Sequence, residues 1–338
     1  MTKSDTQPPE APWRLEEVPC DFCLSAEADR VLSSKEWLHG LPGEFQVVVC
    51  RKCGLARTSP RPTLDTLAAA YPGSYQAYRL PERAKRPPRG LRRWALVNYR
   101  DYPLGRKAPA ALRAVMRPMA AMALSHREAV GYFPYVGQGR LLDFGCGGGK
   151  YVAQMAAAGW KAEGLDLSPD AVREAAATGL TVHQGTLPGA DLPKAAYDLV
   201  TLWHAIEHVP SPKATLAAVR EILRPGGRLA VICPRFDSLP AKWYGDLWYG
   251  LDLPRHLTHF TRDTLVRHVT AAGFVVERTA SIRRPALVRQ SLIRRAEVTR
   301  CAWHRLLARS RLVPRLLSHL VYLAHSTDEV LLVARRAD

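Results

Sequence analysis

The sequence predicts an α/β protein in which a sheet domain follows a small cysteine-rich module. From residue 140 onward, short apolar segments alternate with helical ones, and this alternation is typical of βαβ units around a parallel sheet. Near the N-terminus, two Cys-x-x-Cys pairs indicate a metal-binding module. A chain of 338 residues with 47% hydrophobic content is long enough for both. We therefore expect the cysteine-rich module over residues 1–60, a linker and helical segment over 61–135, and the sheet domain over 136–338.

The four N-terminal cysteines are expected to hold one structural zinc ion. They are Cys20, Cys23, Cys50 and Cys53. Each pair can turn two thiolates toward one ion, and the pairs are separated by 26 residues, as in a zinc ribbon. The alternating segment EFQVVVC before the second pair predicts a strand. A disulfide pairing or a redox motif is the alternative, although a redox motif needs only one pair at the start of a helix. Because thiolates fill all four positions, we expect no catalytic role for the zinc.

The segment between the ribbon and the sheet domain has three predicted parts. A short helix is expected at residues 63–70. Residues 79–94 are rich in proline and arginine, which predicts a mobile link. Residues 107–131 follow a helical pattern that we expect to be interrupted near Pro118.

The sheet domain is predicted element by element from its apolar pattern. Strands are expected at 140–144, 161–168, 180–185, 197–203, 228–234, 274–282 and 328–337. Helices are expected at 151–159, 169–179 and 213–227. Two further segments lengthen the domain: an aromatic connection at 234–260, called the lid below, and an arginine-rich segment at 283–325, called the basic helical insert.

A glycine-rich turn, GCGGGK, follows the first predicted strand. Ligands of parallel α/β sheets bind beyond the carboxyl ends of the strands, so Asp143 and residues 145–149 are expected at the ligand edge. The turn matches a dinucleotide fingerprint loosely, and a phosphate-binding P-loop needs a hydroxyl where Tyr151 stands. Asp166 lies 21 residues after Gly145 and ends the second strand, where a carboxylate can accept both hydroxyls of a ribose. An adenosine group is therefore expected at this edge.

Four segments in this order, LLDFGCGGG, GLDLSPDAV, YDLVTLWHAIEHV and REILRPGGRLAVICP, resemble the class I S-adenosylmethionine-dependent methyltransferases. The resemblance covers residues 140–281 and the last predicted strand. It implies a seven-stranded Rossmann-like methyltransferase sheet that binds S-adenosylmethionine at the ligand edge. The implied cofactor residues are Asp143, Gly145, Cys146 and Gly147 for the methionine part, Asp166 for the ribose and Leu167 for the adenine.

The chain departs from the family pattern after the third strand. Family members often have Gly-Asp there, whereas this chain has Gly185 and Thr186. We expect Thr186 and the backbone near Leu187 to contact the adenine instead. The segment WHAIEHV after the fourth strand is expected to pass over the cofactor, which adds His204 to the cofactor-binding candidates.

The acceptor side is expected to use histidines. His208 is the first candidate for a base that deprotonates the acceptor, with Glu207 orienting it or binding a divalent ion. The lid ends in Arg255, His256 and His259, and a histidine that titrates near neutral pH suits proton transfer. The tryptophans and tyrosines of the lid suit a sugar ring or another flat apolar surface. The alternatives are a structural role for the turn and a packed lid with surface histidines.

The ribbon and the lid together resemble a bacterial subgroup of zinc-ribbon methyltransferases often associated with glycan, cell-envelope and secondary-metabolite pathways. This resemblance implies in-line, histidine-assisted methyl transfer to a hydroxyl, ahead of a carbon, of a glycan, glycolipid or small-molecule acceptor. Amino methyltransferases of nucleobases often carry an Asp/Asn-Pro-Pro-aromatic motif after the fourth strand, and LWHAIEH has no such element. The alternatives are an RNA methyltransferase that grips phosphates through the ribbon and the arginines, and a catalytically silent adaptor.

The formal net charge is +17, and basic residues gather in two blocks. Residues 79–117 hold twelve of them, and residues 283–315 hold ten arginines with one acid, Glu297. Such blocks favour phosphate-bearing partners, and a solvated basic face is the alternative. In the basic helical insert, apolar residues recur at helical spacing among arginines. This pattern predicts either shallow contact with an anionic membrane or ordinary packing against the core.

The cellular location is inferred from three sequence features. The first 20 residues lack the apolar core of a signal peptide, and no apolar run reaches about 18 residues. Seven cysteines, an odd number, argue for a reducing compartment. We therefore expect a cytoplasmic protein. If the basic helical insert contacts an anionic membrane, we expect the protein to bind peripherally to its inner face. Nucleic acid is the less favoured partner.

Overall fold

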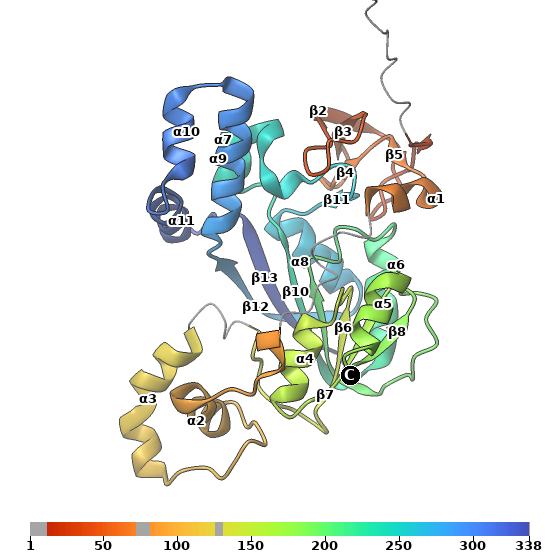
Figure 1. Cartoon of the computed structure of the whole chain (residues 1–338). Coiled ribbons are helices and arrows are strands. Elements are labelled where there is room, and N and C mark those ends of the chain that lie inside the picture. The colour runs from red at the N-terminus through yellow and green to blue at the C-terminus, as the bar shows by residue number, and fades with distance from the viewer. Residues whose placement is uncertain (1–11, 72–81, 126–130, 338) are drawn as a thin grey trace, which may run out of the picture. The chain divides into compact units, whose positions relative to one another are not determined.

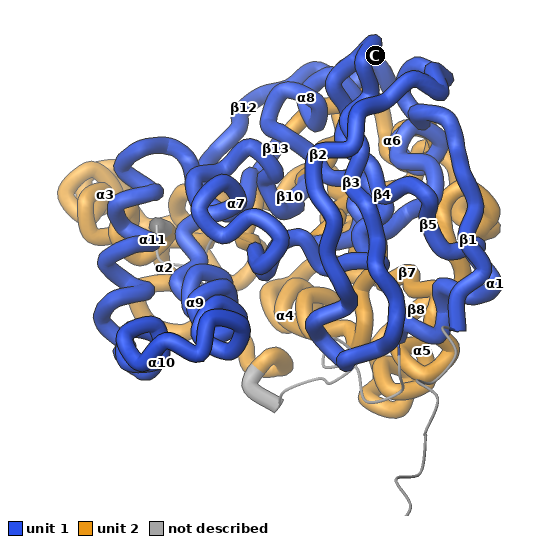
Figure 2. The backbone as a smooth tube through the Cα atoms, turned by 90° about the horizontal axis from the view of Figure 1, so that it is seen from above, with its two compact units in different colours: residues 1–72, 204–216, 231–333 blue, residues 73–203, 217–230, 334–338 orange. Residues whose placement is uncertain are grey.

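The computed structural model describes residues 12–71, 82–125 and 131–337 (Figure 1). The start of the predicted link and residues 126–130 of the predicted helix therefore lie outside the described residues. Contacts group the chain into two compact units (Figure 2). Unit 1 comprises residues 1–72, 204–216 and 231–333, and unit 2 comprises residues 73–203, 217–230 and 334–338. Thus the ribbon, the lid and the basic helical insert share one unit, while the domain boundaries expected from the sequence stay a prediction.

Seven strands form one mixed sheet in the order β12-β13-β10-β9-β6-β7-β8. They are β6 (Arg140–Phe144), β7 (Lys161–Asp166), β8 (Thr181–Gln184), β9 (Tyr197–Trp203), β10 (Leu223–Pro234), β12 (Phe274–Ile282) and β13 (Glu329–Arg336). β6 pairs in parallel with β7 and β9, and β7 pairs in parallel with β8. The predicted seven-stranded α/β sheet is confirmed, and it is a mixed sheet. An apolar pattern identifies a strand without fixing its direction.

The helices of the sheet domain follow the predicted alternation. They are α4 (Lys150–Ala157), α5 (Pro169–Ala176), α6 (Pro212–Ile222) and α8 (Arg262–Ala271). α5 begins after Ser168, whose hydroxyl caps the helix by accepting the Ala171 N–H. The helix expected to reach residue 227 ends at Ile222 instead, and β10 begins at the next residue. The reason lies in Pro225, which has no N–H to donate, and Gly226, which takes a left-handed φ of 70°.

The ribbon forms a small antiparallel sheet that the lid completes. Its strands are β2 (Ala28–Lys35), β3 (Glu44–Cys50), β4 (Ala56–Thr58) and β11 (Thr258–His259), in the order β11-β4-β3-β2. Thr258 and His259 pair with Arg57 and Ala56. A two-stranded sheet of β1 (Leu15–Glu16) and β5 (Arg61–Pro62) accompanies it. The end of the lid is therefore a structural part of the ribbon sheet.

The segment between the ribbon and the sheet domain is more helical than predicted. The expected helix at 63–70 is α1 (Leu64–Leu67) followed by a 3₁₀ turn (Ala68–Ala70). A second 3₁₀ turn, η3, spans Glu82–Lys85. The predicted mobile link is wrong in part, because α2 (Gly90–Tyr99) starts inside it and buries Ala95 and Leu96. α3 (Ala110–Ser125) runs through Pro118 as one helix, without the expected interruption.

The lid and the basic helical insert are helical and pack together. The lid contains α7 (Leu239–Tyr244) and two 3₁₀ turns, Gly245–Leu247 and Tyr249–Leu251. The insert contains α9 (Pro285–Thr299), α10 (Ala302–Arg309) and α11 (Val313–Leu323). Val288, Leu292 and Ala296 of α9 share a buried core with Trp248 of the lid. None of the helices in the described residues is long and apolar enough to cross a membrane.

Candidate active site and metal centre

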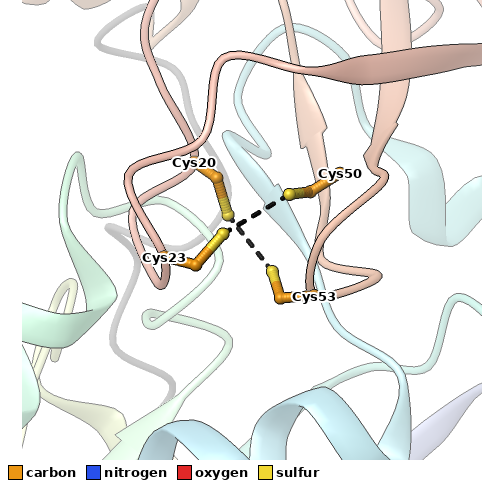
Figure 3. Close-up of side chains that lie close together, drawn as sticks. All are labelled: Cys20, Cys23, Cys50 and Cys53. Carbon is orange, nitrogen blue, oxygen red and sulfur yellow. Dashed lines mark hydrogen bonds between the residues drawn. The ribbon is translucent and has the colours of Figure 1, made fainter.

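The four ribbon cysteines converge on one point (Figure 3). Cys20 Sγ lies 3.4 Å from Cys53 Sγ, and Cys23 Sγ lies 3.5 Å from Cys50 Sγ. The two knuckles have matching backbone bonds, in which the amides of Leu24 and Gly54 donate to the carbonyls of Cys20 and Cys50, each at 2.8 Å. All four are free thiols, and four sulfurs this close fit the tetrahedral coordination of zinc. The geometry favours the predicted metal site over the disulfide alternative.

The glycine-rich turn after β6 needs glycine for backbone reasons. Gly145, Gly147 and Gly149 have φ values of 70°, 52° and 77°, which residues with a side chain rarely adopt. A Cβ at Gly149 would lie 2.6 Å from Leu180 Cδ1, closer than packing allows. The turn is also tied to the next strand, because the Gly145 amide donates to the Leu165 carbonyl at 2.8 Å.

Asp143 is buried at the end of β6. It is 3% exposed, and its Oδ1 accepts a hydrogen bond from the Thr201 hydroxyl at 2.7 Å. Burial, with a smaller contribution from the negative charge of Asp166, raises the pKa of Asp143 to about 8. The carboxyl is therefore largely protonated at neutral pH. A cationic ligand would restore its charge, so this residue fits a cofactor with an ammonium group.

Asp166 and its neighbours line the same edge of the sheet. Asp166 Oδ2 accepts the Gly147 N–H at 2.8 Å, and its Oδ1 accepts the Ser168 N–H at 2.9 Å. Burial raises the pKa of its carboxyl. Leu167 is 69% exposed, as expected for a side chain that a flat ring can cover. The sequence-predicted residues 143, 145–147 and 166 therefore come together in unit 2.

Two further cofactor candidates follow β8, and one lies in the glycine-rich turn. The Gly185 amide donates to the Asp166 carbonyl at 2.9 Å, which brings the next two residues to this edge. Thr186 is half-buried and Leu187 is buried. Cys146 is buried, and burial raises the pKa of its thiol far above the usual range, so it is a poor nucleophile.

The segment after β9 carries an ion-pair chain within unit 1. His204 Nδ1 lies 3.4 Å from Glu207 Oε1, and its Nε2 lies 3.1 Å from Glu329 Oε1. Although burial alone would lower the pKa of His204, the carboxylates of Glu329 and Glu207 raise it to about 10. His204 is therefore an imidazolium between two carboxylates, which suits it to carry charge and not to accept a proton. Its cofactor-binding role stays a prediction.

His208 and His256 lie close to each other and to the buried Glu207. The His208 and His256 ring centroids are 4.6 Å apart, and one ligand atom of each histidine and of Glu207 lies within 4.8 Å of the others. His208 Nδ1 contacts the Tyr71 hydroxyl at 2.9 Å and the Arg255 carbonyl at 3.0 Å. Burial lowers the pKa of His256 well below its usual value, so this ring is neutral. We call Glu207, His208 and His256 the histidine cluster.

The other polar residues at the end of the lid have structural partners. The buried Arg255 guanidinium donates to Asp252 Oδ2 at 3.0 Å, to Glu36 Oε1 at 2.6 Å and to the Ala70 carbonyl at 3.1 Å. His259 lies 3.1 Å from the Thr58 hydroxyl, and burial lowers its pKa to about 3. The expectation of surface histidines does not hold for His256 and His259, which are both buried.

The lid aromatics are mostly part of the core. Trp248 is 1% exposed, and its indole N–H donates to Asp328 Oδ1 at 2.9 Å. Tyr244 is also buried, whereas Trp243 is 45% exposed. The expectation that the lid offers several aromatic faces to a sugar is therefore wrong for Trp248 and Tyr244. A packed indole with a satisfied N–H has the role of a core residue.

Sequence reasoning missed three members of this region. Tyr71 contacts His208, Glu329 pairs with His204, and Glu36 pairs with Arg255. Only Glu329 could have been noticed in the sequence, because an acid directly before the buried apolar run 330–334 is unusual. Glu36 lies in the ribbon and Tyr71 follows it in the linker, and each is at least 137 residues from its partner.

Comparisons with known proteins identify the family of the chain. A family model described as a methyltransferase domain matches residues 108–279, just over half of the chain. The ubiquinone biosynthesis O-methyltransferase of Burkholderia vietnamiensis is 37% identical over 95 residues, which are 26% of this chain and 41% of the relative. The corresponding protein of Cereibacter sphaeroides is 32% identical over 186 residues, which are 51% of this chain and 73% of the relative. The chain thus spans about two fifths of the first relative's length.

Among solved structures, the S-adenosylmethionine dependent methyltransferase from Mesorhizobium loti is similar in fold. The match has 22% identity and a TM-score of 0.44, and it covers 67% of this chain and 98% of that one. The family match places the chain in a defined class, that of S-adenosylmethionine-dependent methyltransferases, EC 2.1.1.-. The chain belongs to the methyltransferase domain family.

Proposed function

We propose that the protein transfers a methyl group from S-adenosylmethionine to a hydroxyl oxygen of a glycan, glycolipid or small-molecule acceptor. The observation that carries the proposal is the histidine cluster, in which a buried carboxylate and one histidine directly after β9 lie close to a second histidine from the lid. The relatives from Burkholderia vietnamiensis and Cereibacter sphaeroides are ubiquinone biosynthesis O-methyltransferases, which supports oxygen ahead of carbon as the acceptor atom.

The residues at the ends of β6 and β7 would hold the cofactor, which supplies an activated methyl group on a sulfonium. Asp143 would ionise and pair with the ammonium group. The two oxygens of Asp166 accept the Gly147 and Ser168 amide hydrogens, and a carboxylate has about four lone-pair sites, so it can still accept a ribose hydroxyl. Leu167 would cover the adenine, with Thr186 and the Leu187 backbone at its rim. His204 is proposed as a further cofactor-binding residue, as expected from the sequence.

The proton of the acceptor hydroxyl would pass to His208. The Arg255 carbonyl can only accept and the Tyr71 hydroxyl oxygen can accept too, so both contacts of His208 Nδ1 are satisfied when Nδ1 carries the proton and Nε2 carries the lone pair. Glu207 would stabilise the imidazolium that forms, because its carboxylate stays ionised. Burial raises the pKa of Glu207, but the neighbouring histidines, His204 first, lower it below its usual value. His256 is the second neutral ring of the cluster and would take part in orienting the acceptor. His259 is assigned a supporting role through Thr58.

The ribbon would hold a structural zinc ion through Cys20, Cys23, Cys50 and Cys53. The proposal is supported by the closeness of the four free thiols. All four coordination positions would then be filled by protein, which leaves none for a substrate.

The basic helical insert would bind an anionic membrane surface, and the acceptor would then be lipid-linked. α9 turns its apolar residues inward, but α10 and α11 leave apolar side chains in solvent. They are Trp303, Leu306, Leu312, Leu316, Leu320 and Leu323, each at least 54% exposed. The exposed arginines 305, 309, 311 and 315 lie on the same two helices and the turn that joins them. Exposed apolar side chains can insert among acyl chains, and exposed arginines on the same helices can pair with anionic lipid headgroups.

The test of the function uses methyl-labelled S-adenosylmethionine and a cell extract separated into lipid, glycan, RNA and small-molecule fractions. We expect label in a lipid, glycan or small-molecule product, held as an alkali-stable ether. His208→Asn should lower kcat by about 100-fold or more, as for loss of a general base, with cofactor affinity unchanged. His39→Asn, an exposed histidine of the ribbon, is the matched control and should keep full activity. Label that enters RNA alone would contradict the proposal.

A further inference from the structure

We propose that Glu207, His208 and His256 form a binding site for one first-row divalent cation of the zinc and cobalt class. Among the described residues, two groups of side chains can converge on a metal ion, and this is the one outside the ribbon. One ligand atom of each residue lies within 4.8 Å of the other two. The proposal goes beyond the proposed function, because it concerns cation binding and holds whichever acceptor is methylated. A nitrogen that binds a cation has no lone pair left for a proton, so His208 Nε2 would serve as the base only in the protein without the cation.

Both histidines present an unprotonated nitrogen to the cluster. His208 Nδ1 lies 3.0 Å from the Arg255 carbonyl, and His256 Nδ1 lies 3.0 Å from the Gly250 carbonyl. Since a carbonyl only accepts, and the Tyr71 hydroxyl oxygen 2.9 Å from His208 Nδ1 can accept as well, all these contacts are satisfied when each Nδ1 carries the proton and each Nε2 carries a lone pair. Histidines that bind metals usually donate their other ring N–H to a carbonyl or carboxylate in this manner. The two rings are therefore held in the tautomer that a metal ion needs.

Glu207 supplies negative charge that has no hydrogen-bond partner. It is 2% exposed, and neither carboxylate oxygen receives a hydrogen bond from the described residues. Its nearest cationic neighbour, His204 Nδ1, is 3.4 Å away, and His256 Nε2 is 4.0 Å away. A buried carboxylate without donors is costly, and a bound cation would remove that cost. His204 would keep its second partner, Glu329, at 3.1 Å.

The ligands are fixed relative to one another by the backbone, although two of them are far apart in sequence. The Glu207 carbonyl accepts the amide hydrogens of Leu257 at 2.8 Å and Thr258 at 3.1 Å, directly after His256. His208 is held to the same segment through the Arg255 carbonyl. Metal ligands at about 2.0 to 2.1 Å in tetrahedral geometry lie about 3.4 Å apart, so the side chains would close by about 1 Å.

The donor set selects the class of cation. Two imidazoles and one carboxylate suit zinc, cobalt, iron and nickel, whereas magnesium and calcium prefer oxygen ligands throughout. Three protein ligands leave at least one position for water or for an oxygen of a bound molecule. This arrangement differs from the ribbon, where thiolates fill every position.

The experiment adds Co²⁺ to the full-length protein after the ribbon has been filled with zinc. We expect one equivalent of Co²⁺ beyond the zinc, with ligand-field absorption in the visible range. Thiolate-to-cobalt charge-transfer bands should be absent, because those would report replacement of the ribbon zinc. Glu207→Gln keeps the shape of the side chain, removes its charge and should weaken Co²⁺ binding by at least about tenfold. His183→Asn is the matched control, since His183 lies 2.9 Å from another carboxylate, Glu163, outside the cluster.

A measurement on the unchanged protein keeps the test decisive if Glu207→Gln fails to fold. Bound Co²⁺ should protect His208 from acylation by diethylpyrocarbonate, as read by mass spectrometry of the labelled peptide. Uptake of zinc by the ribbon with no further Co²⁺ would overturn the proposal. Equal Co²⁺ affinity of Glu207→Gln and the unchanged protein, or acylation of His208 at the same rate with and without Co²⁺, would do the same.

Discussion

Cofactor binding should release a proton, because Asp143 has to ionise when the cofactor's ammonium group arrives. The pKa of Asp143 without ligand is about 8, so about nine tenths of the molecules carry this proton at pH 7. The cofactor's own α-amino group, with an ordinary pKa of about 7.8, takes up about 0.1 proton at the same pH. The net expectation is a release of about 0.8 proton per cofactor bound at pH 7.

The same linkage fixes how affinity depends on pH. The carboxyl is about 1% ionised at pH 6 and about 9% ionised at pH 7, and the ammonium fraction hardly changes. Cofactor affinity should therefore rise about eightfold from pH 6 to pH 7. The sign follows from the protonation states: the free protein holds the extra proton, so binding improves as protons become scarcer. In the free protein the same carboxyl makes folding stability fall as pH rises from about 4 to about 8, because the folded pKa lies above the unfolded one.

Asp143→Asn is the perturbation that isolates this carboxyl. The amide keeps the shape and can still accept the Thr201 hydroxyl hydrogen, but it has no proton to lose. Calorimetry at pH 7 in two buffers of different ionisation enthalpy gives the number of protons directly. We expect release of about 0.8 proton in the unchanged protein and uptake of about 0.1 in Asp143→Asn.

S-adenosylhomocysteine is the matched ligand control. It has the same amino acid end but no sulfonium, so its binding should release the same number of protons. If the two ligands release different numbers of protons, the proton release depends on the sulfonium and not only on the ammonium group beside Asp143. Equal release by Asp143→Asn and the unchanged protein would refute the reasoning.

Three further predictions follow from the contacts described above. Asp166→Ala removes the ribose acceptor, so cofactor affinity should fall by about 1.5 to 3 kcal/mol, as for charged hydrogen bonds; calorimetry with unchanged affinity contradicts the role. Cys50→Ser should abolish zinc retention by elemental analysis and lower the melting temperature; because β11 pairs with β4, catalytic activity should fall too. Leu316→Ser with Leu320→Ser should weaken sedimentation with phosphatidylglycerol vesicles at low salt, whereas Leu112→Ser, an exposed leucine of α3, should not. Equal sedimentation of the unchanged protein with neutral and anionic vesicles would remove the membrane proposal.

Local patterns were sufficient to predict the elements that depend on neighbours in sequence. β6, β9 and β12 have the predicted bounds, because each is an apolar run closed by a change of pattern. The two cysteine pairs are likewise short-range signals, since each knuckle closes within five residues. The sequence analysis explained the glycines of the turn by the close approach of a ligand. Their left-handed φ values are a second, independent reason why glycine is needed at these positions.

Long-range pairing was beyond these patterns. β11 has two residues and therefore no period to detect, yet it joins a strand about 200 positions earlier. The partners of the histidine cluster also come from distant segments, as Tyr71 and His208 illustrate. Trp248 was expected to face a ligand because aromatic side chains suit a sugar ring. Whether an indole is buried, however, depends on which distant segments pack against it. Trp248 is covered by α9. The spacing of arginines in α9 was not enough to predict which face of this helix packs inward.

The buried Arg255 raises the question of why a charge is retained in the core of unit 1. A guanidinium with Glu36 and Asp252 around it is no better for stability than well-packed apolar residues would be, since desolvation offsets the attraction. Its geometry, however, joins three separate segments: Glu36 of the ribbon, the Ala70 carbonyl beside Tyr71, and the lid itself. The carbonyl of the same residue accepts the His208 N–H, so the ion network fixes the acceptor that sets the tautomer of this ring. A hydrophobic replacement of Arg255 alone would leave the buried Glu36 carboxylate without a cation and destabilise the fold, whereas lysine keeps the charge but loses most of the directional bonds to Glu36, Asp252 and the Ala70 carbonyl. We therefore expect Arg255→Lys to retain the fold while losing activity through a raised KM for the acceptor and a shifted pH profile, with cofactor affinity unchanged; equal activity and pH profile in Arg255→Lys would show that the network only supports packing.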